Sequence, residues 1–204
     1  MRNDFIGGLL DALGPRAMNN LANPIGSEPQ VTHAAVQAAL PILLGALARN
    51  ARDPDGAAAL HQAIEEDHSS LDVPDVLATV SAGGGDGEAI LRHVLGGRQS
   101  TAAEGISQAS GLGRGQALQL LKMLAPLVLS YLAKRSQRSG MSAGGLGAML
   151  GQEEQQLQAQ GGLAGRLMGA VLDRDGDGDV DFSDILGAAG SLGQRGRPSL
   201  GSRL

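Results

Sequence analysis

Two long Leu/Ala-rich segments, each with a proline near its middle, constrain the fold of this chain most. They are residues 36–50 (VQAALPILLGALARN) and 121–135 (LKMLAPLVLSYLAKR), which align at an offset of 85 residues with Pro41 opposite Pro126. A helix that is apolar on all sides belongs in a core, and an internal proline removes one backbone hydrogen bond and kinks it. The pattern predicts two pseudo-repeats, each with a proline-kinked central helix.

The sequence around these segments favours an all-α, glycine-punctuated helical bundle. The chain has no Trp, one Tyr and two Phe, so Leu and Ala must form the core, and 32 glycines separate the apolar runs. No alternating β-branched run indicates a sheet. The absence of cysteine excludes disulfides, thiolate zinc sites and cysteine nucleophiles.

Capping signals and short apolar helices complete the predicted element order. Ser27 and Gln30 form an expected capping box before the first long helix, whereas Gly113 to Gly115 open the second more weakly. A short one-faced helix is predicted three times, over residues 8–14, 90–96 and 166–172. We expect a helical domain with internal duplication over 1–152, a helix-loop-helix segment over 153–190 and a basic disordered tail over 191–204.

Residues 173–184 (DRDGDGDVDFSD) have the spacing of an EF-hand calcium loop. That loop needs oxygen ligands at positions 1, 3, 5, 9 and 12, a backbone carbonyl at 7 and a glycine at 6. Gly178 occupies position 6 and Val180 is the usual apolar residue at position 8. The candidate metal ligands are Asp173, Asp175, Asp177, Asp179 through its carbonyl, Asp181 and Asp184. The alternative interpretation is a solvated acidic turn that starts a helix.

Asp184 departs from the pattern, because position 12 usually holds a bidentate glutamate. The shorter side chain makes Mg²⁺ a competitor of Ca²⁺. Loops with aspartate at both ends resemble those of dockerin modules, but those carry two loops and this chain has one, which gives no support to cohesin binding. The loop holds six aspartates and Arg174, which leaves 15 residues of each sign elsewhere, so the net charge of −5 lies in the loop.

Four segments, two of them within the proline-centred runs, carry a resemblance to a known family. They are ALPILLGALA over residues 39–48, Asp67-His68, residues 87–97 with His93-Val94-Leu95-Gly96-Gly97, and residues 121–132. With this apolar pattern, residues 4 to 150 resemble a bacterial family of unknown function, number nine hundred and thirty-seven. The resemblance implies an all-helical cytoplasmic bacterial protein and no particular activity. Ser69-Ser70 replaces the Asp-Gly pair that usually follows Asp-His in that family.

Two alternatives remain open beside a calcium-binding protein. His61, Glu65 and His68 share one helix face at i, i+4 and i+7, a spacing that would suit a metal-dependent hydrolase. The apolar helix around Met123 would suit a peripheral membrane protein, although the 11-residue apolar run 123–133 is too short to span a membrane. His33 and His93 have apolar contexts and are expected to be packed or snorkelling.

We expect a non-enzymatic helical interaction or scaffold protein whose loop binds calcium and thereby orders a terminal helix over 182–189. Its expected partner is another protein or a second copy of the chain. The net negative charge and the lack of aromatic residues that could stack on bases argue against nucleic acid as a partner. Asp4 and Asp11 interrupt the apolar N-terminal stretch, which argues against a signal peptide and for a cytoplasmic location.

Overall fold

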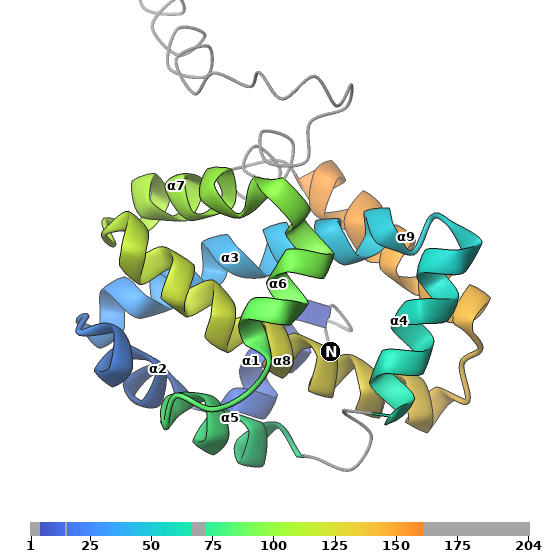
Figure 1. Ribbon diagram of the computed structural model, residues 1–204, viewed down its shortest axis with the longest axis horizontal. Coiled ribbons are helices and arrows are strands. Elements are labelled where there is room, and N and C mark those ends of the chain that lie inside the picture. Colours follow the sequence, from blue (N-terminus) through green and yellow to red (C-terminus); the bar gives the residue numbers. More distant parts are fainter. Residues whose placement is uncertain (1–4, 15, 67–71, 161–204) are drawn as a thin grey trace, which may run out of the picture. The chain divides into compact units, whose positions relative to one another are not determined.

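A computed structural model describes residues 5–14, 16–66 and 72–160 of the chain (Figure 1). Within these ranges all regular structure is helical, which confirms the predicted all-α fold. The elements are α1 (Phe5–Leu13), α2 (Ala17–Ile25), α3 (Pro29–Asn50), α4 (Pro54–Glu66), α5 (Val73–Ser81), α6 (Gly87–Leu95), a short 3-10 turn η1 (Gly96–Arg98), α7 (Gln99–Ser110), α8 (Arg114–Ser139) and α9 (Ala143–Gln160).

The two long helices α3 and α8 form the centre of the bundle (Figure 1). α3 packs against α2, α6, α7, α8 and α9, while α8 packs against α2, α4, α5, α6 and α7. Residues 38–48 of α3 and 123–130 of α8 are buried without interruption. Burial on every side explains why these segments are apolar around their whole circumference.

The two central helices correspond in position as well as in composition. Pro41 and Pro126 are both buried inside helices that continue through them. Each helix follows a shorter one that ends at a glycine with a left-handed backbone, Gly26 at φ 63° and Gly111 at φ 82°. These glycines are 85 residues apart, as are the prolines, and the first residues of α3 and α8 repeat this offset. The duplication itself stays a prediction.

The prediction of a capping box before α3 is wrong. The residue that precedes this helix is Glu28, no side chain caps its first turn, and Ser27 Oγ lies 3.4 Å from the carbonyl oxygen of Glu28. The better side-chain cap is at α8, where Gln116 Oε1 accepts a 2.9 Å hydrogen bond from the Gly113 N–H. Gln116 Nε2 also donates to the Ile25 carbonyl at 2.8 Å, which fixes the start of α8 to the end of α2.

α3 and α8 are long and apolar enough to cross a membrane by length and composition alone. However, 78% and 72% of their most apolar 18-residue segments are buried inside the described structure. The core helix of a globular protein passes the same test, so these two helices are weak evidence for a membrane span. Their apolar character is accounted for by the bundle itself.

Close approach of backbones holds the shorter helices on the core. Gly87 begins α6 and lies against the backbone of α8, so that a Cβ at this position would overlap the carbonyl of Lys122. Gly147 of α9 similarly faces the carbonyl of Ala51, 2.8 Å from where its Cβ would be. Glycine at these two contacts permits the tight helix packing that a core with few aromatic residues needs.

We expect Gly87→Ala to lower the free energy of unfolding by about 1 to 3 kcal/mol, because α6 must move away from rigid backbone of α8. The matched control is Gly115→Ala, also in the first turn of a helix but with no atom within 4 Å of the added Cβ. This control should be neutral or stabilising by up to about 1 kcal/mol. Urea unfolding measures both values, and equal effects of the two variants would contradict the close contact.

Candidate functional site

The predicted calcium ligands lie outside the described residues. The site at Asp173, Asp175, Asp177, Asp179, Asp181 and Asp184 therefore stays a prediction from the sequence, together with the segment 153–190 as a unit. The expected boundary after residue 152 falls inside α9, which continues to Gln160.

The predicted His61, Glu65 and His68 face is described only in part, because His68 lies outside the described residues. His61 is about one-fifth exposed, and its Nε2 lies 2.9 Å from the carbonyl oxygen of Met141, which precedes α9. Because a carbonyl only accepts hydrogen bonds, Nε2 must carry a hydrogen and is occupied. Nδ1 faces Glu65 Oε2 at 3.3 Å, which leaves one ring nitrogen for a metal.

Elsewhere in residues 5–14, 16–66 and 72–160, no group of three or more His, Cys, Asp or Glu side chains is placed to hold a metal ion. His33 and His93, expected to be packed or snorkelling, are both exposed. The hydrolase alternative thus stays a prediction that rests on His68 as well as on His61 and Glu65.

Two consecutive glutamates of α9 are buried, which is unusual for a charged side chain, and their contacts were not predicted from the sequence. Glu153 is 7% exposed and accepts a 3.2 Å hydrogen bond from the backbone N–H of Phe5, while Arg135 of α8 lies 3.6 Å from its other oxygen. Glu154 is 6% exposed and binds Arg52, in the turn between α3 and α4, at 2.8 Å. Pairing offsets part of the cost of burying these carboxylates and connects α9 to three other parts of the bundle.

The two described aromatic residues belong to the same cluster. The rings of Phe5 and Tyr131 meet edge to face, with centroids 4.9 Å apart and planes at 82°. The guanidinium of Arg135 lies 5.9 Å from the Phe5 centroid, within cation–π distance. This arrangement joins α1 to α8 and α9, and its groups are engaged with one another rather than directed at a ligand.

A polar cavity of about 410 Å³ lies beside this cluster, between α1, α5 and α8. Three cations of α8 line it, and two of them are neutralised locally. Lys134 forms an ion pair with Asp72, and Arg135 pairs with Glu153. Among the described residues that line the cavity, the exposed Arg138 is the one cation without an ion pair, so these residues offer only a weak attraction for an anion.

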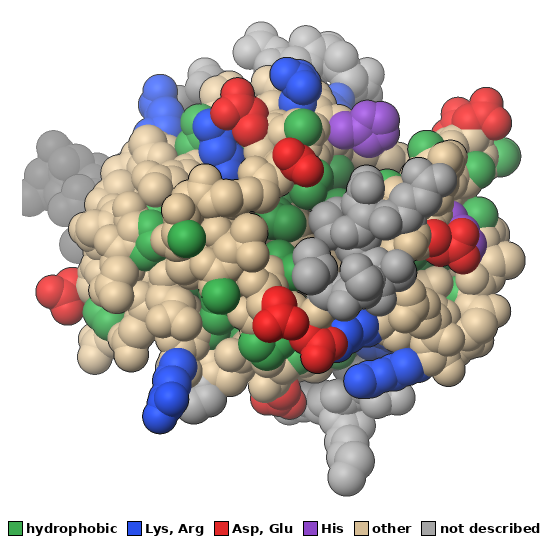
Figure 2. Space-filling view, turned by 60° about the horizontal axis from the view of Figure 1, so that its bottom comes forward, with side chains coloured by type: hydrophobic (Ala, Val, Ile, Leu, Met, Phe, Trp, Pro, Cys, Tyr) green, Lys and Arg blue, Asp and Glu red, His purple; other side chains and the backbone are tan. Residues whose placement is uncertain are grey.

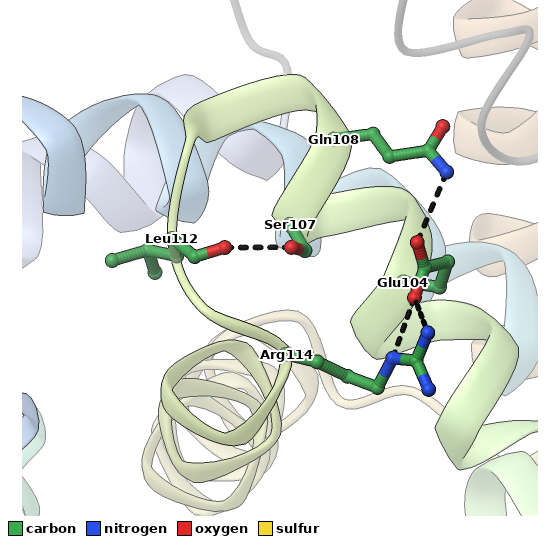
Figure 3. Close-up of polar contacts among 5 residues, drawn as sticks. All are labelled: Glu104, Ser107, Gln108, Leu112 and Arg114. Carbon is green, nitrogen blue, oxygen red and sulfur yellow. Dashed lines mark hydrogen bonds and ion pairs between the residues drawn. The ribbon is translucent and has the colours of Figure 1, made fainter.

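A group of polar contacts lies at the corner between α7 and α8 (Figure 3). Glu104 of α7 accepts a 3.1 Å hydrogen bond from Gln108. It also forms an ion pair with Arg114, the first residue of α8. Ser107 Oγ donates to the carbonyl of Leu112 at 2.6 Å. The hydrogen bond from Gln108, followed by that from Arg114, lowers the pKa of Glu104. These contacts close the turn between α7 and α8.

We expect Glu104→Gln to destabilise the fold at neutral pH but not in acid. Since the folded-state pKa of Glu104 lies below its ordinary value of 4.5, its stabilisation is fully present above that value and is lost as pH falls through the lowered pKa. Urea midpoints of the native chain and the variant should therefore converge in acid. Asp11→Asn is the control, because exposed Asp11 forms no ion pair with a described residue, and an equal, pH-independent effect of both variants would contradict the assignment.

A second hollow of about 330 Å³ lies between α4 and α6 and has an apolar lining. Sequence alone did not predict it. A signal does exist in retrospect, because Gly56, Ala59, Leu60 and Ala63 recur at i, i+3, i+4 and i+7 and so form one face of α4. Such a face of small residues is equally typical of a helix that is packed against a neighbour.

Comparison with known proteins gives one match. The family model described as a bacterial protein of unknown function (DUF937) matches residues 8–135, more than half of the 204 residues. No curated protein and no solved structure matches the chain.

Proposed function

The chain belongs to the bacterial family of unknown function DUF937, and we propose that it is a non-enzymatic interaction or scaffold protein that binds one calcium ion. The helical body supplies the surface for a protein partner or a second copy, and residues 173–184 supply the ion site. We place the protein in the cytoplasm. The observation that carries the proposal is the loop sequence, in which every ligand position holds an oxygen donor and Gly178 stands at the turn.

The distribution of charge supports this proposal. All of the net charge of −5 falls in the loop, since the rest of the chain has equal numbers of basic and acidic residues. Six carboxylates so close together repel one another, and a divalent cation relieves that repulsion. Calcium binding thus changes the free energy of this segment strongly, which is the requirement for a switch.

Several polar groups of the described residues have structural contacts. The buried charged side chains Glu153 and Glu154 each pair with an arginine. One ring nitrogen of His61 is occupied by a backbone carbonyl. These groups hold helices together, and a scaffold of this kind can carry a surface for a partner.

We expect the native chain to bind one calcium ion in calorimetric titration at millimolar magnesium. Asp177→Ala removes a carboxylate from position 5 and should weaken binding by more than ~10-fold. Ser183→Ala is the control in the same loop, because position 11 contributes no ligand. Absence of calcium binding by the native chain, or equal binding by Asp177→Ala, would refute the site. Light scattering of the same samples tests whether calcium changes self-association.

We expect Asp184→Glu to raise calcium affinity and selectivity over magnesium. The longer side chain reaches the ion with both oxygens, and calcium accepts the seven or eight ligands that magnesium cannot. Parallel titrations with each metal measure the ratio of their affinities in the native chain and the variant. An unchanged ratio would show that position 12 does not contact the ion.

A further inference from the structure

The hollow between α4 and α6 arises because these two helices pack on other elements rather than closely on each other. α4 rests on α9 and α8, whereas α6 rests on α8 and α3. Leu47 of α3 and Leu129 of α8 form the floor, and both are buried. We call the space above them the α4–α6 groove.

The walls of the α4–α6 groove are apolar and open to solvent. α4 contributes Gly56, Ala59, Leu60 and Ala63, and α6 contributes Ala89, Ile90 and Val94. Ala59 and Ala89 are exposed, and Leu60, Ile90 and Val94 are half-buried. Figure 2 shows hydrophobic side chains at the bottom of a depression in the middle of one face of the molecule. A concave apolar site of this volume lies in the range of small-molecule pockets.

A second, polar hollow continues the groove at the C-terminal end of α6. It has a volume of about 150 Å³ and shares Asn50, His93 and Val94 with the α4–α6 groove. Asn50 Nδ2 donates a 3.2 Å hydrogen bond to the Val94 carbonyl, which positions this junction. Arg49 and Arg98 also line the polar hollow. Arg98 is half-buried and forms no ion pair with a residue that the structure describes.

The combined site has opposite charges at its two ends. Asp86 lines the groove at the N-terminal end of α6, while Arg98 lies just beyond the C-terminal end. The nine residues of α6 separate these ends by about 13 Å at 1.5 Å per residue. A ligand with an anionic group and an apolar chain therefore has a preferred orientation, with its charge beside Arg98 and away from Asp86.

We propose that the α4–α6 groove and the adjoining polar hollow bind a free monocarboxylate with a single medium-length alkyl chain. The chain lies on Leu47, Leu60 and Leu129. The carboxylate accepts hydrogen bonds from Arg49 and Arg98, with His93 at the junction. Burial of the alkyl chain supplies affinity, and the charge-assisted hydrogen bonds select the anionic head. The residues of this site are different from the predicted calcium ligands, and the proposal does not rest on calcium binding.

Decanoate, kept below the concentration at which it forms micelles, is the probe for calorimetric titration of the full chain. The native chain should bind it, and octanoate should bind about tenfold more weakly because two methylenes fewer are buried. Decanol, which lacks the charge, should also bind about tenfold more weakly. Equal binding of decanol and decanoate would overturn the assignment of an anionic head.

Two substitutions on α4 separate the groove from the rest of the helix. Ala59→Asp places a carboxylate in the groove and should abolish decanoate binding. Ala58→Asp makes the same change at the adjacent exposed position, which does not line the groove, and should bind as the native chain does. Thermal melting checks that both variants are folded. Undiminished binding by Ala59→Asp, or no binding by the native chain, would overturn the proposal.

Arg98→Gln tests the head group without altering the groove. It should weaken decanoate binding about tenfold and leave decanol binding unchanged. An equal loss for both ligands would overturn the role of Arg98. A vesicle arm distinguishes the source of the ligand, because binding of anionic phospholipid vesicles without binding of free decanoate would overturn the assignment to a soluble molecule.

Discussion

Burial of the middle of α3 and α8 is the interaction on which the rest of the bundle depends. These segments are buried over residues 38–48 and 123–130, and the shorter helices are held by covering them. With so few aromatic rings, the apolar stabilisation comes from many small contacts, which require short distances between helices. Gly87 and Gly147 provide those distances where they face the carbonyls of Lys122 and Ala51. The glycine content therefore serves close packing as well as punctuation.

Charge decides how the last described helix is placed. α9 buries Leu146 and Leu150, an apolar contact that a sliding helix could make in several registers. Glu153 and Glu154 remove this freedom, because each carboxylate must reach its own arginine and a buried carboxylate without a partner costs several kcal/mol. Arg135 also stacks on Phe5, so one cation joins α8, α9 and the N-terminal helix. Specific charge pairs thus fix the register of α9, which the apolar contacts of the Leu/Ala core alone do not determine.

Local patterns in the sequence were sufficient to predict the central helices but not the contacts between helices. The apolar runs around Pro41 and Pro126 predicted the two central helices, since such signals lie within one segment. The capping box at Ser27 failed because a residue before proline favours an extended backbone; Glu28 is the last non-helical residue, and Ser27 is one position too early to cap. The hydrogen bond from the Phe5 N–H to Glu153, 148 residues apart, depends on tertiary packing, which no local pattern encodes. The face of small residues on α4 is a local pattern, but tertiary packing decides whether such a face is packed against a neighbour or lines a groove.

The two proposed sites differ in how much of their affinity comes from charge, because the net charge of the chain is unevenly distributed. The loop holds the whole net charge of −5, whereas the rest of the chain is balanced, so divalent cations are attracted mainly to the loop. At the ionic strength of a cell, such attraction is screened within about 8 Å. The α4–α6 groove attracts a carboxylate through individual cations at one end, and it gains affinity chiefly from the apolar area that it buries. Salt should therefore weaken ion binding at the loop far more than it weakens the alkyl contribution at the groove.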